Sequence, residues 1–411
     1  MSKIELLSPA GDKEKLQTAF YYGADAAYFA GKRFGLRAYA GNFEKDELKE
    51  QIEYAHSLGK KAYITLNILA HEIDFKGLKE YVEYLDEIKA DAVIVADLGI
   101  LGIVREVAPN MPIHVSTQAN ITNKYTAKMF ADMGATRLIL ARELSLKEIK
   151  AIRDYLPESV ELETFVHGAM CMAYSGRCLL SNYLTGRDAN RGACAQPCRW
   201  EYTITEKGRN GEQFEIKEDE RGTYILNSKD LNVIEHLNLL MEAGVTSFKI
   251  EGRMKSPYYV ATTTNAYKRA IDILEKDPKN YEAPQELVDE LNKASHRDYT
   301  TGFYFGNEDR NNIKTSAPVS TYKFIAIVLE DAKDGYILVE QRNRFEVGDE
   351  LEVLSPNENF NKTLKVTEVL NEDKEQVTVA NLVQQRLYLK TNLKLKTGDM
   401  LRIKSDEKSI D

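Results

Sequence analysis

The sequence has only four cysteines and no long hydrophobic run. No apolar stretch approaches the roughly 20 residues that a membrane-spanning helix needs. The N-terminal residues MSKIELLSPAGDKEK also lack the apolar core of a secretory signal. We therefore expect a cytoplasmic protein with no membrane partner. Disulfides are rare in that compartment, where clustered cysteines more often bind metal.

Basic residues are fewer than acidic ones: the sequence has 55 Lys and Arg residues and 64 Asp and Glu residues, which gives a net charge of −9. This balance excludes a broad basic surface for nucleic acid, so any contact with RNA must be local. Three common motifs are absent as well. HEIDF at His71 lacks the second histidine of the HExxH zinc motif, no GxSxG elbow occurs, and SPAGDKEK is one glycine short of a dinucleotide-binding fingerprint.

A repeated α/β pattern fills the first two thirds of the chain. The segments YGADAAYFAG, IKADAVIVAD, MGATRLILAR and AGVTSFKIEGR each combine a helix end, a small or glycine-containing turn and a short strand-like run. The expected strands start near Ile4, Ala26, Lys61, Ala92, Ile113, Arg137, Val160 and Ser247. Eight strands that alternate with helices favour an α/β fold of the (β/α)8 TIM-like barrel type, with an open, Rossmann-like sheet as the alternative.

Three domains or segments are expected along the chain. Residues 1–275 form the TIM-like catalytic barrel, and residues 168–228 form a long insertion after its seventh strand. Residues 276–318 form a helical linker. The sequence pattern then changes to short segments in which apolar and polar residues alternate, such as KFIAIVLE and GYILVEQ. Residues 319–405 are therefore predicted to form a small all-β barrel domain.

All four cysteines lie in the insertion, with the spacing C-x6-C-x15-C-x3-C: Cys171, Cys178, Cys194 and Cys198. Structural zinc sites favour closely spaced pairs, and only Cys194 and Cys198 fit that pattern. A 4Fe–4S cluster tolerates irregular spacing, and four unconnected cysteines are the third interpretation. Spacing alone leaves iron–sulfur and zinc open. Because barrel active sites lie at the carboxyl ends of the strands, chemistry is expected here. Four arginines surround the thiols: Arg177, Arg187, Arg191 and Arg199.

The same region carries a resemblance to a known family. ETFVHGAMCMAYSGRC, followed by GACAQPCR, is similar to the collagenase-like U-type peptidase family (family thirty-two), as are LLSPAG, RFGLRAYAGNF, LNSKDL and KIEGRMKSPYYV. The similarity runs from about Ile4 to Phe305. Some members are described as collagenases, whereas others act in oxygen-independent hydroxylation of tRNA uridine, ribosomal RNA cytidine or ubiquinone precursors. The resemblance implies that the four cysteines hold a 4Fe–4S cluster and that prephenate is the oxygen donor.

Prephenate has two carboxylates, so its site needs basic residues near the cluster. The basic candidates, at predicted strand ends or in nearby loops, are Arg37, Arg142, Arg177, Lys249 and Arg253. Two amides are expected to join them in substrate binding: Asn67 and Asn120. The candidates that would orient the acceptor or shuttle protons are His167, Glu163, Glu251 and Gln118. Each of these residues taken alone is more often a structural hydrogen-bonding group.

The expected function is RNA hydroxylation, in particular the formation of 5-hydroxyuridine in tRNA. Its expected partners are tRNA, a small-molecule oxygen donor and either a partner protein or a paralogue. A small-molecule hydroxylase of the quinone type and a collagenase-like, metal-dependent peptidase are the alternatives. A scaffold protein with structural zinc is the non-enzyme alternative.

Overall fold

The computed structural model describes residues 3–35, 41–171, 173–200, 218–219, 222–223, 229–306 and 318–405. Within these residues, eight parallel strands form a closed barrel. They are β1 (Glu5–Pro9), β2 (Ala26–Phe29), β3 (Lys61–Leu66), β4 (Ala92–Val95), β5 (Ile113–Val115), β6 (Arg137–Ile139), β7 (Glu161–Ala169) and β11 (Ser247–Ile250). The last strand, β11, pairs with both β1 and β7 and so closes the barrel. The predicted TIM-like fold is confirmed.

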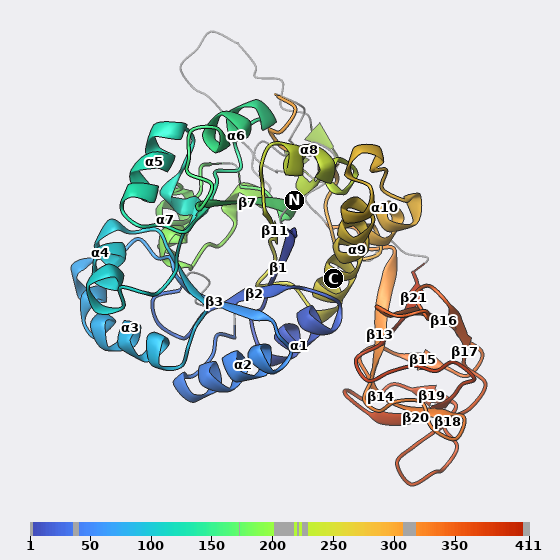
Figure 1. Ribbon diagram of the computed structural model, residues 1–411. Coiled ribbons are helices and arrows are strands. Elements are labelled where there is room, and N and C mark those ends of the chain that lie inside the picture. Colours follow the sequence, from blue (N-terminus) through green and yellow to red (C-terminus); the bar gives the residue numbers. More distant parts are fainter. Residues whose placement is uncertain are drawn as a thin grey trace.

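Helices surround this barrel on the outside (Figure 1). They are α1 (Lys13–Tyr21), α2 (Lys45–Ser57), α3 (Leu78–Glu87), α4 (Leu98–Val107), α5 (Lys124–Asp132), α6 (Leu146–Arg153), α8 (Leu237–Glu242) and α9 (Pro257–Lys276). Side-chain caps fix several of their starts, for example Asp97 on α4 and Asn123 on α5. None of the helices in the described residues is both long and apolar enough to cross a membrane.

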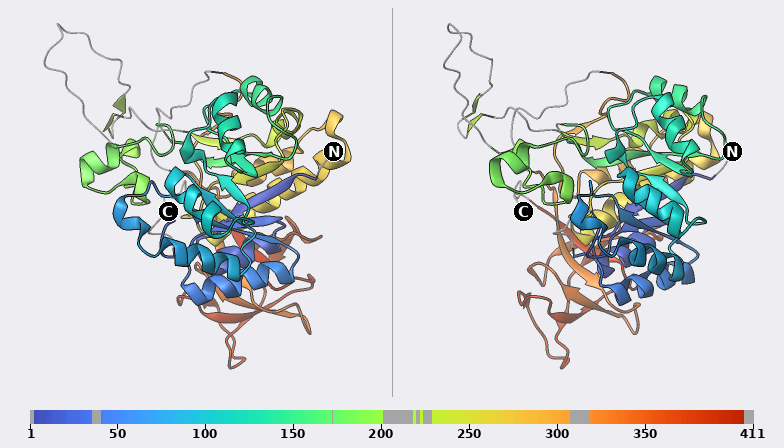
Figure 2. Two further views of the ribbon diagram at one scale, coloured as in Figure 1. Left: turned by 60° about the vertical axis from the view of Figure 1, so that its left-hand side comes forward. Right: turned by 90° about the vertical axis from the view of Figure 1, so that its left-hand side faces the viewer.

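The chain leaves the barrel after β7 and enters the cysteine-bearing insertion. Its described part contains α7 (Leu180–Thr185) and two short 3-10 helices, Ala189–Arg191 and Pro197–Arg199. Two short strands, β8 (Glu218–Asp219) and β9 (Gly222–Thr223), pair antiparallel. The chain then returns as β10 (Asp230–Asn232), which pairs antiparallel with β7. Figure 2 shows α7 at one end of the barrel and the N-terminus at the other.

A linker leads from the barrel to a second domain. It contains α10 (Gln285–Leu291) and β12 (Tyr299–Thr300), which pairs with β10. In the described residues, the second domain is antiparallel and all-β, with its main sheet in the order β17-β16-β21-β13-β14-β20-β18. Its strands are β13 (Tyr322–Val328), β14 (Tyr336–Gln341), β15 (Phe345–Glu346), β16 (Glu350–Leu354), β17 (Thr363–Lys365), β18 (Val369–Leu370), β19 (Val379–Ala380), β20 (Arg386–Lys390) and β21 (Met400–Lys404).

Buried polar contacts join the two domains. Arg402 of β21 is fully buried and donates to both carboxylate oxygens of Glu290 on α10, and it also pairs with Glu352 of β16. The hydroxyl of Tyr22, just after α1, donates to the Leu354 carbonyl at 2.8 Å. These contacts fix the β domain against the outside of the barrel, so it does not cover the end that carries α7 (Figure 2).

Candidate active site

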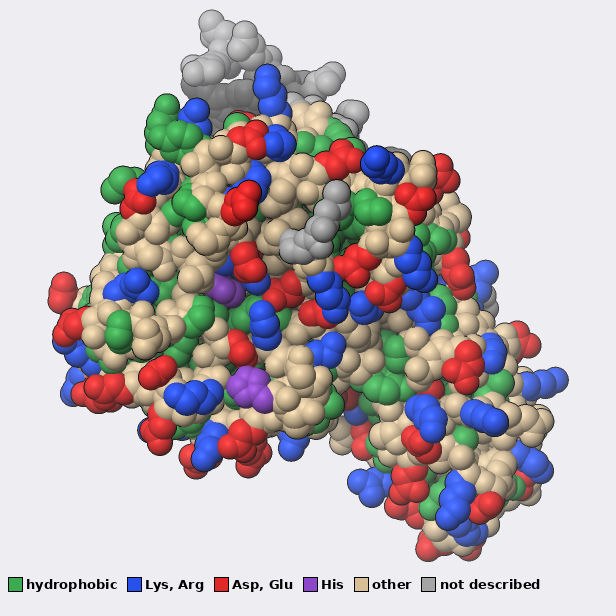
Figure 3. Space-filling view, in the orientation of Figure 1, with side chains coloured by type: hydrophobic (Ala, Val, Ile, Leu, Met, Phe, Trp, Pro, Cys, Tyr) green, Lys and Arg blue, Asp and Glu red, His purple; other side chains and the backbone are tan. Residues whose placement is uncertain are grey.

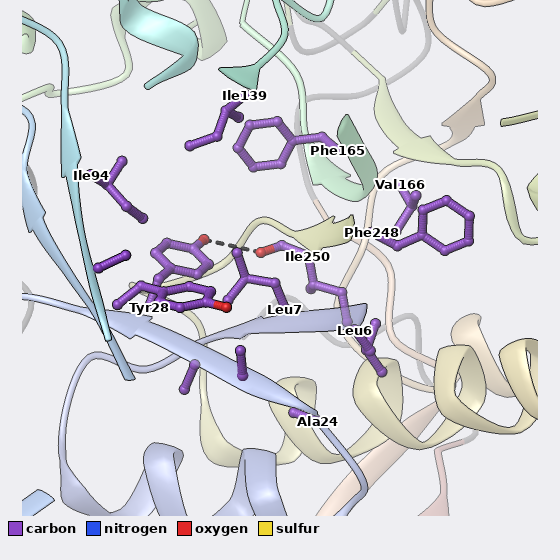
Figure 4. Packing of buried hydrophobic residues seen from close by; sticks show 14 of the residues in the cluster. Leu6, Leu7, Ala24, Tyr28, Ile94, Ile139, Phe165, Val166, Phe248 and Ile250 are labelled. Carbon is purple, nitrogen blue, oxygen red and sulfur yellow. Dashed lines mark hydrogen bonds between the residues drawn. The ribbon is translucent and has the colours of Figure 1, made fainter. Parts of the chain in front are cut away.

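A cavity of about 420 Å³ lies at the carboxyl ends of the barrel strands. Its inner part is apolar, and Figure 4 shows the side chains of Ile94, Ile139, Phe165 and Tyr28 gathered around one space in the barrel. The Tyr28 hydroxyl donates to the Ile250 carbonyl at 3.0 Å, which fixes that ring. The outer wall consists of the insertion. An apolar interior with a few polar groups at the mouth is typical of a small-molecule or nucleobase site.

Hydrogen bonds from the barrel hold the insertion over the cavity. The Asn120 amide donates to the carbonyls of Gln118 and Ser175, both at 2.9 Å. Arg142 donates to the Ser175 hydroxyl at 2.9 Å and to the Ala169 carbonyl at 2.7 Å. Asn120 has the left-handed backbone conformation that asparagine tolerates, with φ of 55°. It does not line the cavity, so its observed role is to position the insertion.

All four cysteines line this cavity and none forms a disulfide. Arg142 lies 3.8 Å from the Cys171 sulfur, and the backbone N–H of Gln196 donates to the Cys194 sulfur at 3.3 Å. Such donors stabilise thiolates, which are the form that binds metal. In the described part of the chain, no three His, Cys, Asp or Glu side chains converge on one point. The four thiols thus have the donor chemistry of a metal centre, but in this structure they are not gathered in the arrangement of one.

The arginines of the insertion have different environments. Arg191 forms a bidentate pair with Asp74 of the segment before α3, and this hydrogen bond holds the pKa of Asp74 below its ordinary value. Arg187 donates to the Ala193 carbonyl at 3.1 Å. Arg177 is exposed and lines the cavity. The side chain of Arg199 lies outside the described residues, as does the whole of Arg37.

A chain of buried charges leads from the barrel interior to the cavity. Lys249 lines the cavity, and its Nζ lies 2.7 Å from Glu163 Oε1 and 4.3 Å from the centre of the Tyr28 ring. Glu163 is fully buried beneath it and pairs with Arg137, which in turn pairs with Glu5. Burial lowers the pKa of Lys249, although Glu163 opposes that shift. A lysine of this kind is a compact cation with little water around it, suited to an anionic ligand.

Three further candidates line the cavity close to Lys249. Arg253 is 3% exposed, and its guanidinium lies 3.4 Å from the Thr65 hydroxyl and 2.5 Å from the Asn42 side-chain oxygen. Glu251 and Asn67 also line the cavity. Arg142, Lys249 and Arg253, together with the exposed Arg177, thus bring four cationic side chains to one cavity, against the single carboxylate of Glu251. That arrangement favours a ligand with more than one negative group.

Gln118 presents an amide without a partner on its oxygen. The side chain lines the cavity and is 8% exposed, and its Oε1 is buried with no hydrogen-bond partner. A buried amide oxygen left unpaired costs about 1–3 kcal/mol. A ligand that donates an N–H there recovers this cost.

The His167 side chain does not line the cavity and has no described contact with a cysteine, although its backbone carbonyl accepts a hydrogen bond from the Glu251 N–H at 2.9 Å. Its ring packs against Tyr259, Tyr267 and Tyr299, with centroid distances of 5.4–5.9 Å. Its Nδ1 lies 3.4 Å from the Tyr267 hydroxyl. Burial, together with the nearby charge of His296, lowers the pKa of His167 to about 3. The ring is therefore neutral near pH 7 and belongs to an aromatic box between β7 and α9. We expected a catalytic role for it.

The predicted ring of polar residues is thus partly assembled. The candidates that line the cavity are Gln118, Glu251, Asn67, Arg142, Arg177, Lys249, Arg253 and the four cysteines. Glu163 lies beneath Lys249, while Asn120 and His167 are not among the residues that line the cavity. Sequence reasoning missed several lining residues: Tyr28, Thr65, Ser116, Thr117 and Asn190. Of these, Thr65, Ser116 and Thr117 could have been found, because they too lie at or just after the ends of predicted strands.

Two models of one family match most of the chain. The model described as "Peptidase family U32" matches residues 11–314, and the model described as "Peptidase family U32 C-terminal domain" matches residues 320–402.

Three proteins that are similar to this chain have names that indicate different activities. It is 39% identical over 405 residues to the "tRNA hydroxylation protein P1" of Bacillus subtilis, over 97% of this chain and 94% of the relative. It is 36% identical over 366 residues to the Escherichia coli "23S rRNA 5-hydroxycytidine C2501 synthase", over 87% of this chain and 53% of the relative. It is 33% identical over 316 residues to the "Collagenase" of Porphyromonas gingivalis, over 74% of each.

Proposed function

The chain belongs to peptidase family U32, and from this premise we propose that it is an enzyme that hydroxylates tRNA, forming 5-hydroxyuridine. One observation carries the proposal: all four cysteines line a cavity that also contains four cationic side chains and an amide oxygen without a hydrogen-bond partner. These groups suit a redox centre, an anionic small molecule and a nucleobase in one place. The names of the relatives that modify tRNA and ribosomal RNA support the same reaction class.

The four thiols of Cys171, Cys178, Cys194 and Cys198 would hold a 4Fe–4S cluster. Replacing the C5–H bond of uracil by C5–OH, with oxygen supplied at the level of a hydroxide, releases one proton and two electrons. A bound iron–sulfur cluster would accept these two electrons one at a time and pass them to an external one-electron acceptor, such as a redox protein. Structural zinc would fit four thiols as well but would supply no electrons.

The oxygen donor we propose is prephenate, which carries a ring hydroxyl and two carboxylates. Lys249 and Arg253 are both almost fully buried at the cavity, and Arg142 adds a third cation beside Cys171. Charge-assisted hydrogen bonds of this type orient a dicarboxylate and raise its affinity. The apolar side chains of Phe165 and Ile139 offer packing for its ring.

Gln118 is the residue that we propose to hold the target base. Its Oε1 would accept the N3–H of uracil, and its amide N–H groups would donate to a neighbouring carbonyl of the base. Glu251, which lines the same cavity, would take up the proton that leaves C5. Both roles require only side chains that already face the cavity.

Proteolysis, the activity that the family name suggests, has less support in this site. A cysteine peptidase needs a histidine within hydrogen-bond reach of a thiol. His167 lies in the tyrosine box, and no histidine lines the cavity in the described part of the chain. Because one relative is named Collagenase, proteolysis is an outcome that an experiment should be able to reveal.

Nucleoside analysis of tRNA from a deletion strain tests the proposal. Complementation with the wild-type gene should restore 5-hydroxyuridine, whereas Cys194→Ser and Gln118→Leu variants should not. The exposed Val383→Ala change on the β domain serves as the control and should restore it fully. Unchanged 5-hydroxyuridine in the deletion strain would refute the proposal, and loss of collagen cleavage or of a quinone in that strain would identify the alternative.

A further inference from the structure

The outer face of the insertion exposes several large apolar side chains. Tyr183 on α7 is 86% exposed, and Leu179 just before the helix is 68% exposed. Tyr174 and Leu184 are 48% and 43% exposed. We call these four residues, together with Arg177 and Arg187, the rim face. Exposed aromatic side chains that gather at the mouth of a cavity indicate a binding surface rather than a packing defect.

The rim face is positively charged on an otherwise acidic protein. Arg177 and Arg187 are both exposed, and Asp188 is the only acidic residue between Phe165 and Trp200 in the sequence. The chain as a whole carries a net charge of −9. Arginine among exposed tyrosines is the composition of surfaces that stack bases and contact phosphates.

The rim face is continuous with the cavity. Tyr174, Arg177 and Leu179 line the cavity and are exposed at the same time. Tyr183 follows one helical turn later, and its backbone N–H bonds to the Leu179 carbonyl at 2.8 Å. A polymer that lies on Tyr183 can therefore place one of its units in the cavity without leaving the surface.

Other described surfaces fit RNA less well. On the β domain, Lys390 pairs with Glu368 at 3.0 Å and Lys396 with Asp331 at 2.7 Å, while Arg402 is buried at the domain interface. Figure 3 shows the molecule from the end opposite α7, where Lys and Arg side chains alternate with Asp and Glu. Neither surface combines exposed arginine with exposed aromatic rings at the mouth of the cavity in the way that the rim face does.

We propose that the rim face is a docking surface for unpaired nucleotides of RNA that flank the target base. Their bases stack on Tyr183 and Tyr174, and Arg177 and Arg187 contact the phosphates. The proposal rests on the proposed function, which it deepens by specifying a single-stranded segment as the substrate. A base-paired segment does not fit, because paired bases cannot stack on protein rings while one of them enters the cavity.

Binding measurements on the full-length protein, purified without oxygen, test the proposal. The probe is a fluorescein-labelled RNA stem-loop with a uridine in its loop, compared with the same strand annealed to its complement. We expect the stem-loop to bind more tightly and Tyr183→Ala to weaken its binding about tenfold. Tyr183→Trp should preserve binding because it keeps a stacking ring. Tyr125→Ala is the matched control, since Tyr125 is 64% exposed on α5, which does not line the cavity.

Salt dependence adds a second readout. Each phosphate contact to a single strand contributes about 0.7 to the slope of log affinity against log salt. Arg177→Ala should lower the slope by about that amount, and Arg177→Lys should restore it. Equal affinity for stem-loop and duplex, or unchanged binding in Tyr183→Ala and Arg177→Ala, would overturn the proposal and assign the rim face to another partner, such as a protein.

Binding and hydroxylation can fail separately. If the stem-loop binds with the expected sensitivity to Tyr183 but tRNA gains no hydroxyl group, the proposed function is wrong and the docking surface stands. If wild-type protein hydroxylates tRNA while the rim variants do so with unchanged KM, the docking surface is wrong and the function stands.

Discussion

The unfolding free energy at mildly acidic pH gives a quantitative test of the role of His167. The ring is 1% exposed, and its pKa in the folded protein is about 3, whereas an unfolded histidine titrates near 6.5. Between these values the unfolded chain binds a proton that the folded protein does not. Stability therefore falls as pH decreases through that window. From pH 7 to pH 5 this one residue should remove about 2 kcal/mol from the free energy of unfolding.

Urea unfolding at a series of pH values measures this contribution. His167→Phe keeps an aromatic ring in the tyrosine box but cannot titrate, and His167→Gln keeps a polar group. Other buried histidines affect all three proteins equally, so the difference between the pH profiles isolates His167. We expect the wild-type protein to lose about 2 kcal/mol more than either variant between pH 7 and pH 5. Parallel profiles, combined with loss of hydroxylation in both variants, would refute the structural role and restore a catalytic one.

Three other substitutions probe the site and its supports. Lys249→Met should raise the KM for prephenate at least tenfold, because a charge-assisted hydrogen bond contributes about 1.5–3 kcal/mol. Lys249→Arg should recover part of the lost affinity. An unchanged KM in Lys249→Met would show that Lys249 does not bind prephenate. Asn120→Gly keeps the left-handed backbone but removes the amide that holds Ser175, so iron per chain should fall after anaerobic purification; full iron content would contradict the anchoring role. Arg402→Met leaves the fully buried Glu290 with one partner fewer and should lower the free energy of unfolding in urea by about 3–5 kcal/mol. An added Glu290→Leu change should recover much of that loss. An equal or greater loss of stability in the double variant would contradict this explanation.

The barrel and the location of the site could be predicted because both depend on local patterns. Runs such as AVIV at β4 are buried on both faces, as parallel strands require, and the turns before them end helices. The insertion was recognisable because a long segment after the seventh strand interrupts the regular alternation of strands and helices, and all four cysteines lie inside it. Once the strand ends are known, residues such as Gln118 and Arg142 must lie at the same edge of the barrel.

The position of the His167 side chain could not be predicted, because it depends on a local irregularity in pairing. Glu163, Phe165 and His167 alternate along β7 and would all face the barrel interior in a regular strand. The register shifts after Lys249, which pairs with Phe165, so that Ile250 pairs with His167 and Val166 is an extra residue. A bulge of this kind reverses the facing of the residues beyond it. His167 therefore points to the tyrosines of α9 and β12, not to the cavity.

The buried charges show a second limit of sequence reasoning. Glu163 was expected near the substrate, yet it lies under Lys249 and is held by Arg137. These three residues come from β7, β11 and β6, and their contact depends on the stagger of the strands around the barrel. In the same way, the cationic residues of β20 and β21 form a stripe in the sequence, whereas in the fold Arg402 is buried against Glu290.

Iron and acid-labile sulfide per chain, measured on protein purified without oxygen, report on the proposed cluster itself. We expect about four of each, falling together in Cys171→Ala and Cys194→Ala variants, because all four thiols line one cavity. Stoichiometric zinc without sulfide in protein from anaerobic cells would contradict the account, since such a site could not accept the electrons that base hydroxylation releases.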